Sequence, residues 1–360
     1  MAKNALKGFN MRPGGVFDVK YTEDIAIIRT KAHWALLLSG LCLLAVLPLM
    51  ASSHYLVVFN HIGITIIAVQ GLSLLTGFTG QISIGQSAMM AVGAYTTGIL
   101  AKRYGIPFWT AIPLSGLSAG CVGLIFGLPS LRVKGFYLAM ATLAAQFIIP
   151  WMINNVRVDI TGGVFSLVVP PPELMGYRLD SQFKMYYLII PLAALMTFFV
   201  KNIVRSGIGR AFIAIRDNDL AAEVMGVNLF YYKLLSFFLC SFFAGVAGAL
   251  WAYWMRAINA ENFTLIESVF FLGMIITGGM GSVTGAIFGV IYLKFLDELA
   301  RALPMLIGNI FPAISVGAEA ALQPLLFGLG ILVFVLLEPR GIAHRWEMFK
   351  SYYRLWPFSD

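Results

Sequence analysis

The sequence has little charge. Of its 360 residues only 12% are Asp, Glu, Lys or Arg, about half the share that is usual in soluble proteins. None of these four types occurs in the 68 residues from Trp34 to Ala101, whereas a helix needs only about 20 apolar residues to cross a bilayer. Because 59% of the residues are hydrophobic, the composition excludes a disordered, collagenous or disulfide-built protein. We therefore expect a membrane protein.

Cysteine and histidine are also scarce. The three Cys lie in apolar stretches without CxxC spacing, and the four His are scattered without i, i+4 pairing, so we expect neither disulfides nor a metal site. No Gly-Lys dipeptide occurs, which excludes a P-loop for ATP. The adjacent carboxylates Asp297 and Glu298 lie one helical turn from Lys294 and Arg301, a pattern that favours structural ion pairs over a catalytic pair. No catalytic residue and no cofactor are expected.

Charges and prolines divide the chain into apolar segments. Because lipid-exposed backbone must satisfy its own hydrogen bonds, we predict an all-α polytopic helix bundle. The third, sixth and eighth segments are short enough to be half-spans. Acids and His are nearly absent from the segments, which argues against a proton-coupled transporter. The ten predicted spans are approximately Trp34 to Ala51, Leu56 to Leu75, Gln86 to Ala101, Trp109 to Leu128, Phe136 to Met152, Met185 to Val200, Leu234 to Met255, Leu265 to Thr277, Ala286 to Leu303 and Ala320 to Leu337.

The positive charges predict the orientation. With the N-terminus inside, the inner segments hold 17 Lys and Arg and the outer segments hold six. Cytoplasmic loops carry such an excess, so the net charge of +8 indicates topology rather than nucleic-acid binding. We expect a transmembrane domain at 34–337 between a cytoplasmic N-terminal segment, 1–33, and a cytoplasmic tail, 338–360.

Two connections of about thirty residues are long enough to carry structure of their own. On this topology residues 153–183 lie outside and residues 201–233 lie inside. In the inner connection we predict a short helix from Leu220 to Met225, with an N-cap at position 217, 218 or 219 and a glycine stop at Gly226. A short cytoplasmic helix between spans is a shape that a partner protein's groove can hold.

Two glycine-rich segments interrupt apolar runs with a similar pattern. They read TGFTGQISIG from Thr76 and TGGMGSVT from Thr277. At membrane depth such breaks are tolerated only inside protein or beside a water-filled cavity, so they indicate an internal repeat with a translocation pathway at the repeat interface. The alternatives are close helix contacts through small residues, or simple turns. The candidate pathway residues are Thr76, Gly77, Gly80, Gln81, Ser83, Gln86, Thr277, Gly278, Gly279 and Gly281.

Several segments together resemble one known family. The run GLSLLTGFTGQISIGQSAMMAVGAYTTGIL from Gly71 is similar to the signature of the permeases of branched-chain amino-acid ABC importers, of the longer LivM type. The resemblance continues in GLPSLRVKGFYLAMATLA from Gly127, SGIGRAFIAIRDNDLAAEVMGVN from Ser206, GVAGALWA from Gly245 and the second glycine-rich segment. It covers about residues 56–337.

The resemblance implies a bacterial inner-membrane importer with a second permease, two cytoplasmic ATPases and a periplasmic binding protein. It also implies that 220–226 docks on the ATPase, because the segment matches the Ala-Ala-x-x-x-Gly part of the importer coupling motif. Leu220 replaces the leading Glu of that motif, so Arg216, Asp217 or Glu223 is expected to make the charge contact. The candidate coupling residues are Arg210, Arg216, Asp217, Asp219, Ala221, Ala222, Glu223 and Gly226.

The function expected from the resemblance is that of a permease subunit that forms half of the pathway for branched-chain or related amino acids. Urea, short amides and small aromatic acids are alternative solutes, because similar permeases carry them. The outer connection, 153–183, is the candidate contact for the binding protein. A stand-alone secondary transporter or channel is the alternative from a different class, and it would need no ATPase.

Overall fold

The computed structural model describes residues 31–131, 135–174, 176–308, 312–338 and 340–355. The chain divides into two compact units, Met1–Val57 and Val58–Asp360. In the first unit, helix α2 (Lys31–Met50) has no charged residue after Lys31, and helix α3 (Ser53–Leu72) begins. Most of the expected N-terminal segment 1–33 lies outside the described residues. The second unit holds all the sites described below.

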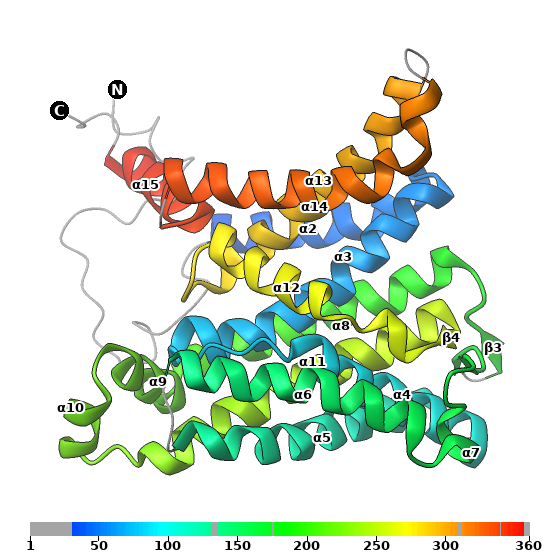
Figure 1. Cartoon of the computed structure of the whole chain (residues 1–360). Coiled ribbons are helices and arrows are strands. Elements are labelled where there is room, and N and C mark those ends of the chain that lie inside the picture. Colours follow the sequence, from blue (N-terminus) through cyan, green and yellow to red (C-terminus); the bar gives the residue numbers. More distant parts are fainter. Residues whose placement is uncertain (1–30, 132–134, 175, 309–311, 339, 356–360) are drawn as a thin grey trace, which may run out of the picture. The chain divides into compact units, whose positions relative to one another are not determined.

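A helix stands at each of the ten predicted apolar segments, which confirms the all-α fold class (Figure 1). The sixth segment was expected to be short, but its helix has 24 residues because polar residues extend it at both ends. Besides α2 and α3, these helices are α4 (Gln86–Tyr104), α5 (Phe108–Gly127), α6 (Phe136–Asn155), α8 (Gln182–Arg205), α11 (Leu229–Met255), α12 (Leu265–Gly278), α13 (Val283–Gly308) and α14 (Pro312–Leu337).

In the described part of the chain, six helical stretches are long and apolar enough to cross a membrane, and a bent pair formed by 322–337 and 342–352 would be a seventh. Helix α13 is not among them, and it carries four charged residues. The stretches are Ser53–Phe78, Phe108–Leu131, Phe136–Asn155, Gln182–Arg205, Leu229–Met255 and Ala260–Gly278. The protein is therefore a multi-pass membrane protein.

Helix α11 packs along both α4 and α5, and glycines make this approach possible. A Cβ atom on Gly248 of α11 would collide with the carbonyl of Met90 on α4, and one on Gly245 would lie 2.6 Å from the carbonyl oxygen of Ser115 on α5. Small residues let membrane helices approach closely. Phe243, Val246 and Leu250 of α11 are buried and belong to the hydrophobic core.

The two long connections are structured, as predicted. Residues 153–183 hold helix α7 (Val158–Thr161) and strands β1 (Leu167–Val168), β2 (Glu173–Leu174) and β3 (Tyr177–Arg178). Strand β1 pairs antiparallel with β4 (Ala257–Ile258), which ties the connection to the end of α11, and β2 pairs with β3.

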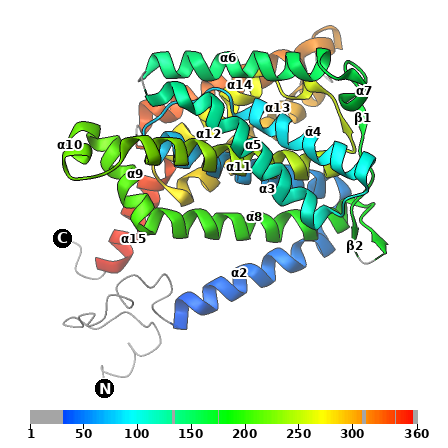
Figure 2. The ribbon, with the colours of Figure 1, turned by 90° about the horizontal axis from the view of Figure 1, so that it is seen from below.

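The connection predicted at 201–233 is shorter than expected, because α8 continues to Arg205 and α11 begins at Leu229. Helices α9 (Gly207–Asp217) and α10 (Asp219–Val224) occupy most of what remains. Figures 1 and 2 both place α10 at one end of the helices and α7 at the other. The two connections thus lie at opposite ends of this unit.

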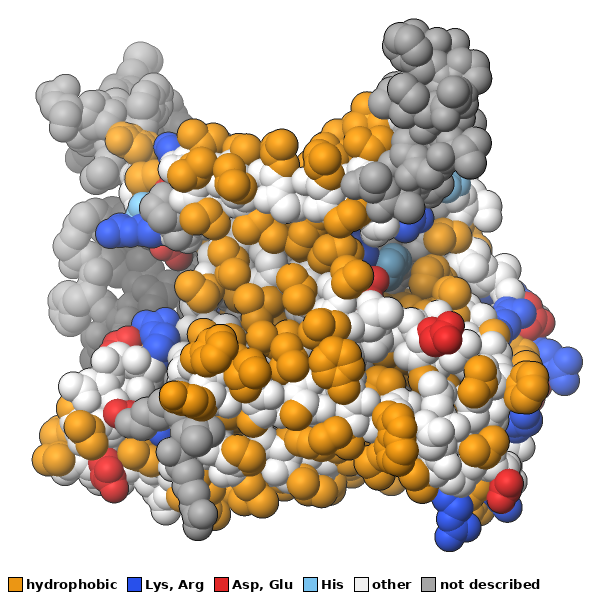
Figure 3. All heavy atoms as spheres, in the orientation of Figure 1, with side chains coloured by type: hydrophobic (Ala, Val, Ile, Leu, Met, Phe, Trp, Pro, Cys, Tyr) orange, Lys and Arg blue, Asp and Glu red, His pale blue; other side chains and the backbone are white. Residues whose placement is uncertain are grey.

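Helix α13 packs against α12 and α14, and the expected tail contains a further helix, α15 (Ile342–Leu355). On the face shown in Figure 3, hydrophobic side chains cover the helices, and most charged side chains gather toward the two ends. This distribution suits a surface whose middle faces hydrocarbon and whose ends face water.

Candidate functional site

The first glycine-rich segment is a break in a helix, as the sequence predicted. Helix α3 passes into a π-helical turn, η2 (Ser73–Phe78), and the chain then runs without helix until α4 begins at Gln86. Single π-helical turns are rare in proteins, and those that occur are often found at functional sites. Gly80 has φ +74°, a left-handed conformation that glycine adopts without steric cost.

The second segment is also a break. Helix α12 ends at Gly278, and α13 begins at Val283. Gly279 and Gly281 between them have φ +112° and +79°, so both need glycine. A Cβ atom on Gly279 would lie 3.0 Å from the carbonyl oxygen of Arg340. This break therefore packs against the turn between α14 and α15.

The structure brings the two breaks into contact. A Cβ atom on Gly77 would lie 2.6 Å from the backbone nitrogen of Gly281 and 3.3 Å from its Cα atom. Two segments about 200 residues apart in the sequence thus meet through bare backbone, a contact that only residues without side chains permit. We call this contact the glycine junction.

The polar side chains of the first break have partners within the protein. Thr76 Oγ1 donates to the carbonyl of Gln81 at 3.2 Å, and Gln81 Nε2 donates to Ser236 Oγ on α11 at 2.9 Å. Gln86 Nε2 donates to the carbonyl of Ala68, 2.7 Å away. Ser83 is buried as well. These side chains hold the break against α3 and α11, and their contribution to a pathway stays a prediction.

Arg216 connects helix α9 to the glycine junction. It lies in the last turn of α9, and its Nη1 atom donates to the carbonyl oxygen of Gly77 at 3.2 Å. A Cβ atom on Gly80 would lie 3.0 Å from Arg216 Cγ, and one on Gly281 would lie 2.8 Å from Arg216 Nη1. Nε of the same guanidinium pairs with Asp217 at 3.1 Å. Arg216 therefore contacts both breaks, an arrangement that the sequence did not reveal.

Helix α10 confirms the predicted short helix. Asn218 is its N-cap and accepts a hydrogen bond from the Ala221 backbone nitrogen at 3.1 Å. Gly226 follows the helix with φ +87°, the usual stop. Leu220, Val224 and Met225 expose 67%, 87% and 83% of their surface, whereas Ala222 is buried.

Of the remaining coupling candidates, Asp219 and Glu223 lie on α10 and Arg210 lies on α9. Asp219 pairs with buried Lys233 of α11 at 3.4 Å, so it anchors α10 to the bundle. Arg210 and Glu223 are exposed. A partner protein can thus reach the side chains of Arg210 and Glu223 and the exposed apolar residues of α10.

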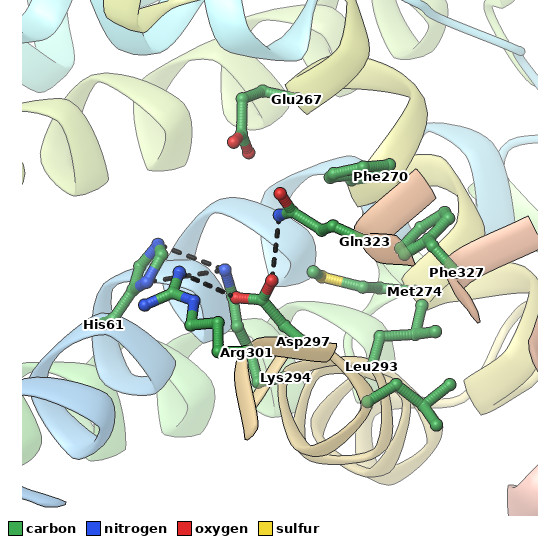
Figure 4. A pocket seen from close by; sticks show the side chains of 11 residues that line it. His61, Glu267, Phe270, Met274, Leu293, Lys294, Asp297, Arg301, Gln323 and Phe327 are labelled. Atoms are coloured by element: carbon green, nitrogen blue, oxygen red, sulfur yellow. Dashed lines mark hydrogen bonds and ion pairs between the residues drawn. The ribbon is translucent and has the colours of Figure 1, made fainter. Parts of the chain in front are cut away.

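A cavity of about 50 Å³ lies between α3, α12, α13 and α14 (Figure 4). Lys294, only 9% exposed, reaches His61 Nε2 at 3.1 Å. Asp297 accepts hydrogen bonds from Arg301 at 3.1 Å and from Gln323 at 2.8 Å. Apolar side chains complete the lining: Phe270, Met274, Leu293, Leu296 and Phe327.

This cluster corrects one expectation. The ion pair between Asp297 and Arg301 was predicted, but Lys294 contacts His61 rather than a carboxylate. The histidines are scattered in the sequence, but His61 and Glu267 line one cavity with three other ionisable residues. The available signal was the position of Glu267 and Lys294 inside predicted spans, since ionisable residues there are functional candidates by default.

A multi-pass helical protein with two broken helices that meet inside it belongs to the class of membrane transport proteins. The comparison with known families specifies the class: residues 54–336 match the permease component of branched-chain amino-acid transport systems, and the chain belongs to this family. The resemblance to ABC-importer permeases is thus confirmed. No solved structure matches the chain.

The chain is similar to LivM, the high-affinity branched-chain amino-acid transport system permease protein of Escherichia coli K12. The two are 32% identical over 291 residues, which cover 74% of this chain and 68% of LivM. A probable LivM of Methanocaldococcus jannaschii is 25% identical over 240 residues, 64% of this chain and 67% of that protein. The fructose import permease FruG of Bifidobacterium longum is 24% identical, over 74% of this chain and 76% of FruG.

Proposed function

We propose that this chain is the permease subunit of an ATP-driven importer of branched-chain or related amino acids, and that it forms half of the pathway beside a second permease. Two cytoplasmic ATPases and a periplasmic binding protein complete the proposed complex. LivM, by its name, belongs to a branched-chain amino-acid transport system, which supports the solute class. The family itself supports the role as a transport subunit.

The contact of Arg216 with the glycine junction carries the proposal of coupling to an ATPase. Val224, the last residue of α10, and its C-cap Met225 are exposed, and an exposed apolar helix end suits a groove on a partner protein. Arg216 lies three residues before the start of α10, and its guanidinium reaches Gly77. A displacement of α10 by the ATPases therefore acts directly on both helix breaks. A stand-alone transporter has no need for this connection.

The topology of the proposal places α10 in the cytoplasm and α7 with its neighbouring strands in the periplasm. The opposite positions of these elements in Figures 1 and 2 support it. The excess of positive charge on the α10 side supports it too. The outer connection would then receive the binding protein.

Co-purification of the tagged full chain from native membranes tests the proposal. We expect ATPase subunits and a second permease in the preparation. The double variant Val224→Asp with Met225→Asp should lose the ATPases, because it places carboxylates on the docking face. The matched variant Val164→Asp with Phe165→Asp changes residues that are 69% and 82% exposed at the opposite end, and it should retain them.

Two outcomes would contradict this reading. Amino-acid uptake by a preparation free of ATPases would mean that the chain works alone. Retention of the ATPases by both double variants would mean that α10 is not the docking helix.

A further inference from the structure

The cavity between α3, α12, α13 and α14 contains two opposite charges that do not meet. Asp297 is neutralised by Arg301 at 3.1 Å. Among the described residues, however, no hydrogen bond or ion pair reaches the Glu267 carboxylate, and Lys294 contacts only the ring of His61. In Figure 4 the Glu267 carboxylate lies apart from the group formed by His61, Lys294 and Arg301.

The position of Glu267 is itself unusual. Thr264 caps α12 by accepting a hydrogen bond from the Glu267 backbone nitrogen at 3.4 Å. In a complete capping box the Glu side chain at this position reaches back to the backbone of the cap. Here the carboxylate lines the cavity instead. The Glu267 side chain thus lines the cavity and does not complete the capping box.

Separated charges inside a membrane protein are expensive, and they are tolerated where a partner or a ligand compensates them. A metal ion does not suit this site, because no three His, Cys, Asp or Glu side chains in the described ranges converge to hold one. A simple anion or cation would satisfy only one of the two charges. A small zwitterion, with an ammonium and a carboxylate, would satisfy both.

The apolar residues of the lining indicate what side chain such a zwitterion would carry. The cavity that Glu267 and Lys294 line is also lined by Phe270, Met274 and Phe327. The rings of Phe270 and Phe327 are in contact, with centroids 3.9 Å apart. An apolar surface beside a pair of opposite charges matches an α-amino acid with an aliphatic side chain.

The location of the cavity suits a solute that arrives from the outer end. The ring of His61 stacks on Trp254, with centroids 5.7 Å apart, and Trp254 is the second-last residue of α11. Glu267 lies in the first turn of α12, shortly after β4. The cavity therefore lies toward the end opposite α10.

We propose that this cavity is a solute site that binds the ammonium of an aliphatic α-amino acid at Glu267 and its carboxylate at Lys294. The proposal rests on the proposed function and specifies the solute's chemistry. A volume of about 50 Å³ is enough for a few waters or a polar head group but below the roughly 150 Å³ that holds benzene. The proposal therefore requires the cavity to widen when the whole solute enters.

Equilibrium binding tests the site. The complex of this chain with its permease and ATPase partners is placed in nanodiscs without the binding protein, and radiolabelled L-leucine is the probe. Wild-type complex should bind leucine saturably. Glu267→Gln and Lys294→Met should each weaken binding at least about tenfold, because each removes a charge-assisted contact. Glu261→Gln, an exposed carboxylate six positions before Glu267, should bind like wild type.

Competition by two analogues separates a binding role from a structural one. Isocaproate is leucine without the ammonium, and isopentylamine resembles leucine without the carboxylate. Wild type should prefer leucine to both. Glu267→Gln should lose the preference over isocaproate alone, and Lys294→Met should lose the preference over isopentylamine alone. A proportional loss of affinity for all three compounds would overturn the proposal.

The proposed function can stand when this site fails. If wild-type complex takes up leucine with its binding protein but shows no direct leucine binding without it, the site is wrong and the importer is right. If the complete system takes up no amino acid, the proposed function itself is wrong.

Discussion

The glycine junction makes the substitution Gly77→Ala a sharp test of the packing. The added Cβ atom would lie 2.6 Å from the backbone nitrogen of Gly281, whereas ordinary contacts begin at 3.4 Å. The two backbones must therefore separate by about 0.8 Å. Neither break can yield by a side-chain rotation, because the opposing atoms belong to backbone. Overpacking of this kind costs about 1–3 kcal/mol.

A glycine in an open position provides the matched control. Gly328 lies within α14, and a Cβ atom there would meet nothing within 4 Å. Gly328→Ala should be neutral or should stabilise the chain by about 0.5–1 kcal/mol, because alanine restricts the unfolded backbone. Thermal unfolding of the purified variants in one detergent compares them directly.

The same two variants give a functional result. Gly77→Ala should reduce amino-acid uptake at equal amounts of membrane-inserted protein, because the junction must keep its close approach as the breaks move. Gly328→Ala should transport at the wild-type rate. If Gly77→Ala unfolds at the wild-type temperature and transports normally, the two breaks do not meet at Gly77 and Gly281.

Three other predictions concern Arg216, the N-cap of α10, and the close contact between α11 and α4. Arg216→Gln should lower uptake at least about fivefold while ATP hydrolysis continues, because the hydrogen bond to Gly77 is worth about 1–1.5 kcal/mol; equal losses of both activities would contradict this. Asn218→Ala should weaken α10 by about 1 kcal/mol and reduce ATPase recovery, with Asn218→Asp as the control; unchanged recovery in Asn218→Ala would exclude a role for the cap. Gly248→Val should abolish stable insertion, measured as protein extracted in folded form, because its side chain would collide with Met90; a normal yield would refute the close contact.

Much of the fold follows from the sequence because lipid imposes a simple rule. Every backbone group in hydrocarbon must be paired within a helix, so the apolar runs predict the helices directly. The ends are less predictable. Helix α8 runs past its apolar run to Arg205, because a helix continues into water wherever capping and packing permit it, and Ser206 caps both this end and the start of α9.

The site was only partly predictable for the same physical reason. Glycine-rich breaks are local features, so Gly77 and Gly281 could be selected from the sequence, and so could α10 with its cap. Contacts between distant segments are not local. Glu267, Lys294 and His61 are separated by up to 233 positions, and each looks unremarkable beside its own neighbours.

The sequence by itself determined that the chain is a multi-pass helical membrane protein, where its helices break, and to which permease family it belongs. These properties depend on hydrophobicity, backbone freedom and short motifs, all of which act over a few residues. The tertiary structure alone decided that the two breaks touch, that Arg216 reaches both, and that Glu267 and Lys294 face one cavity without pairing. Such arrangements depend on how α3, α9, α12 and α13 pack, and packing is set by side-chain complementarity between segments far apart in the chain.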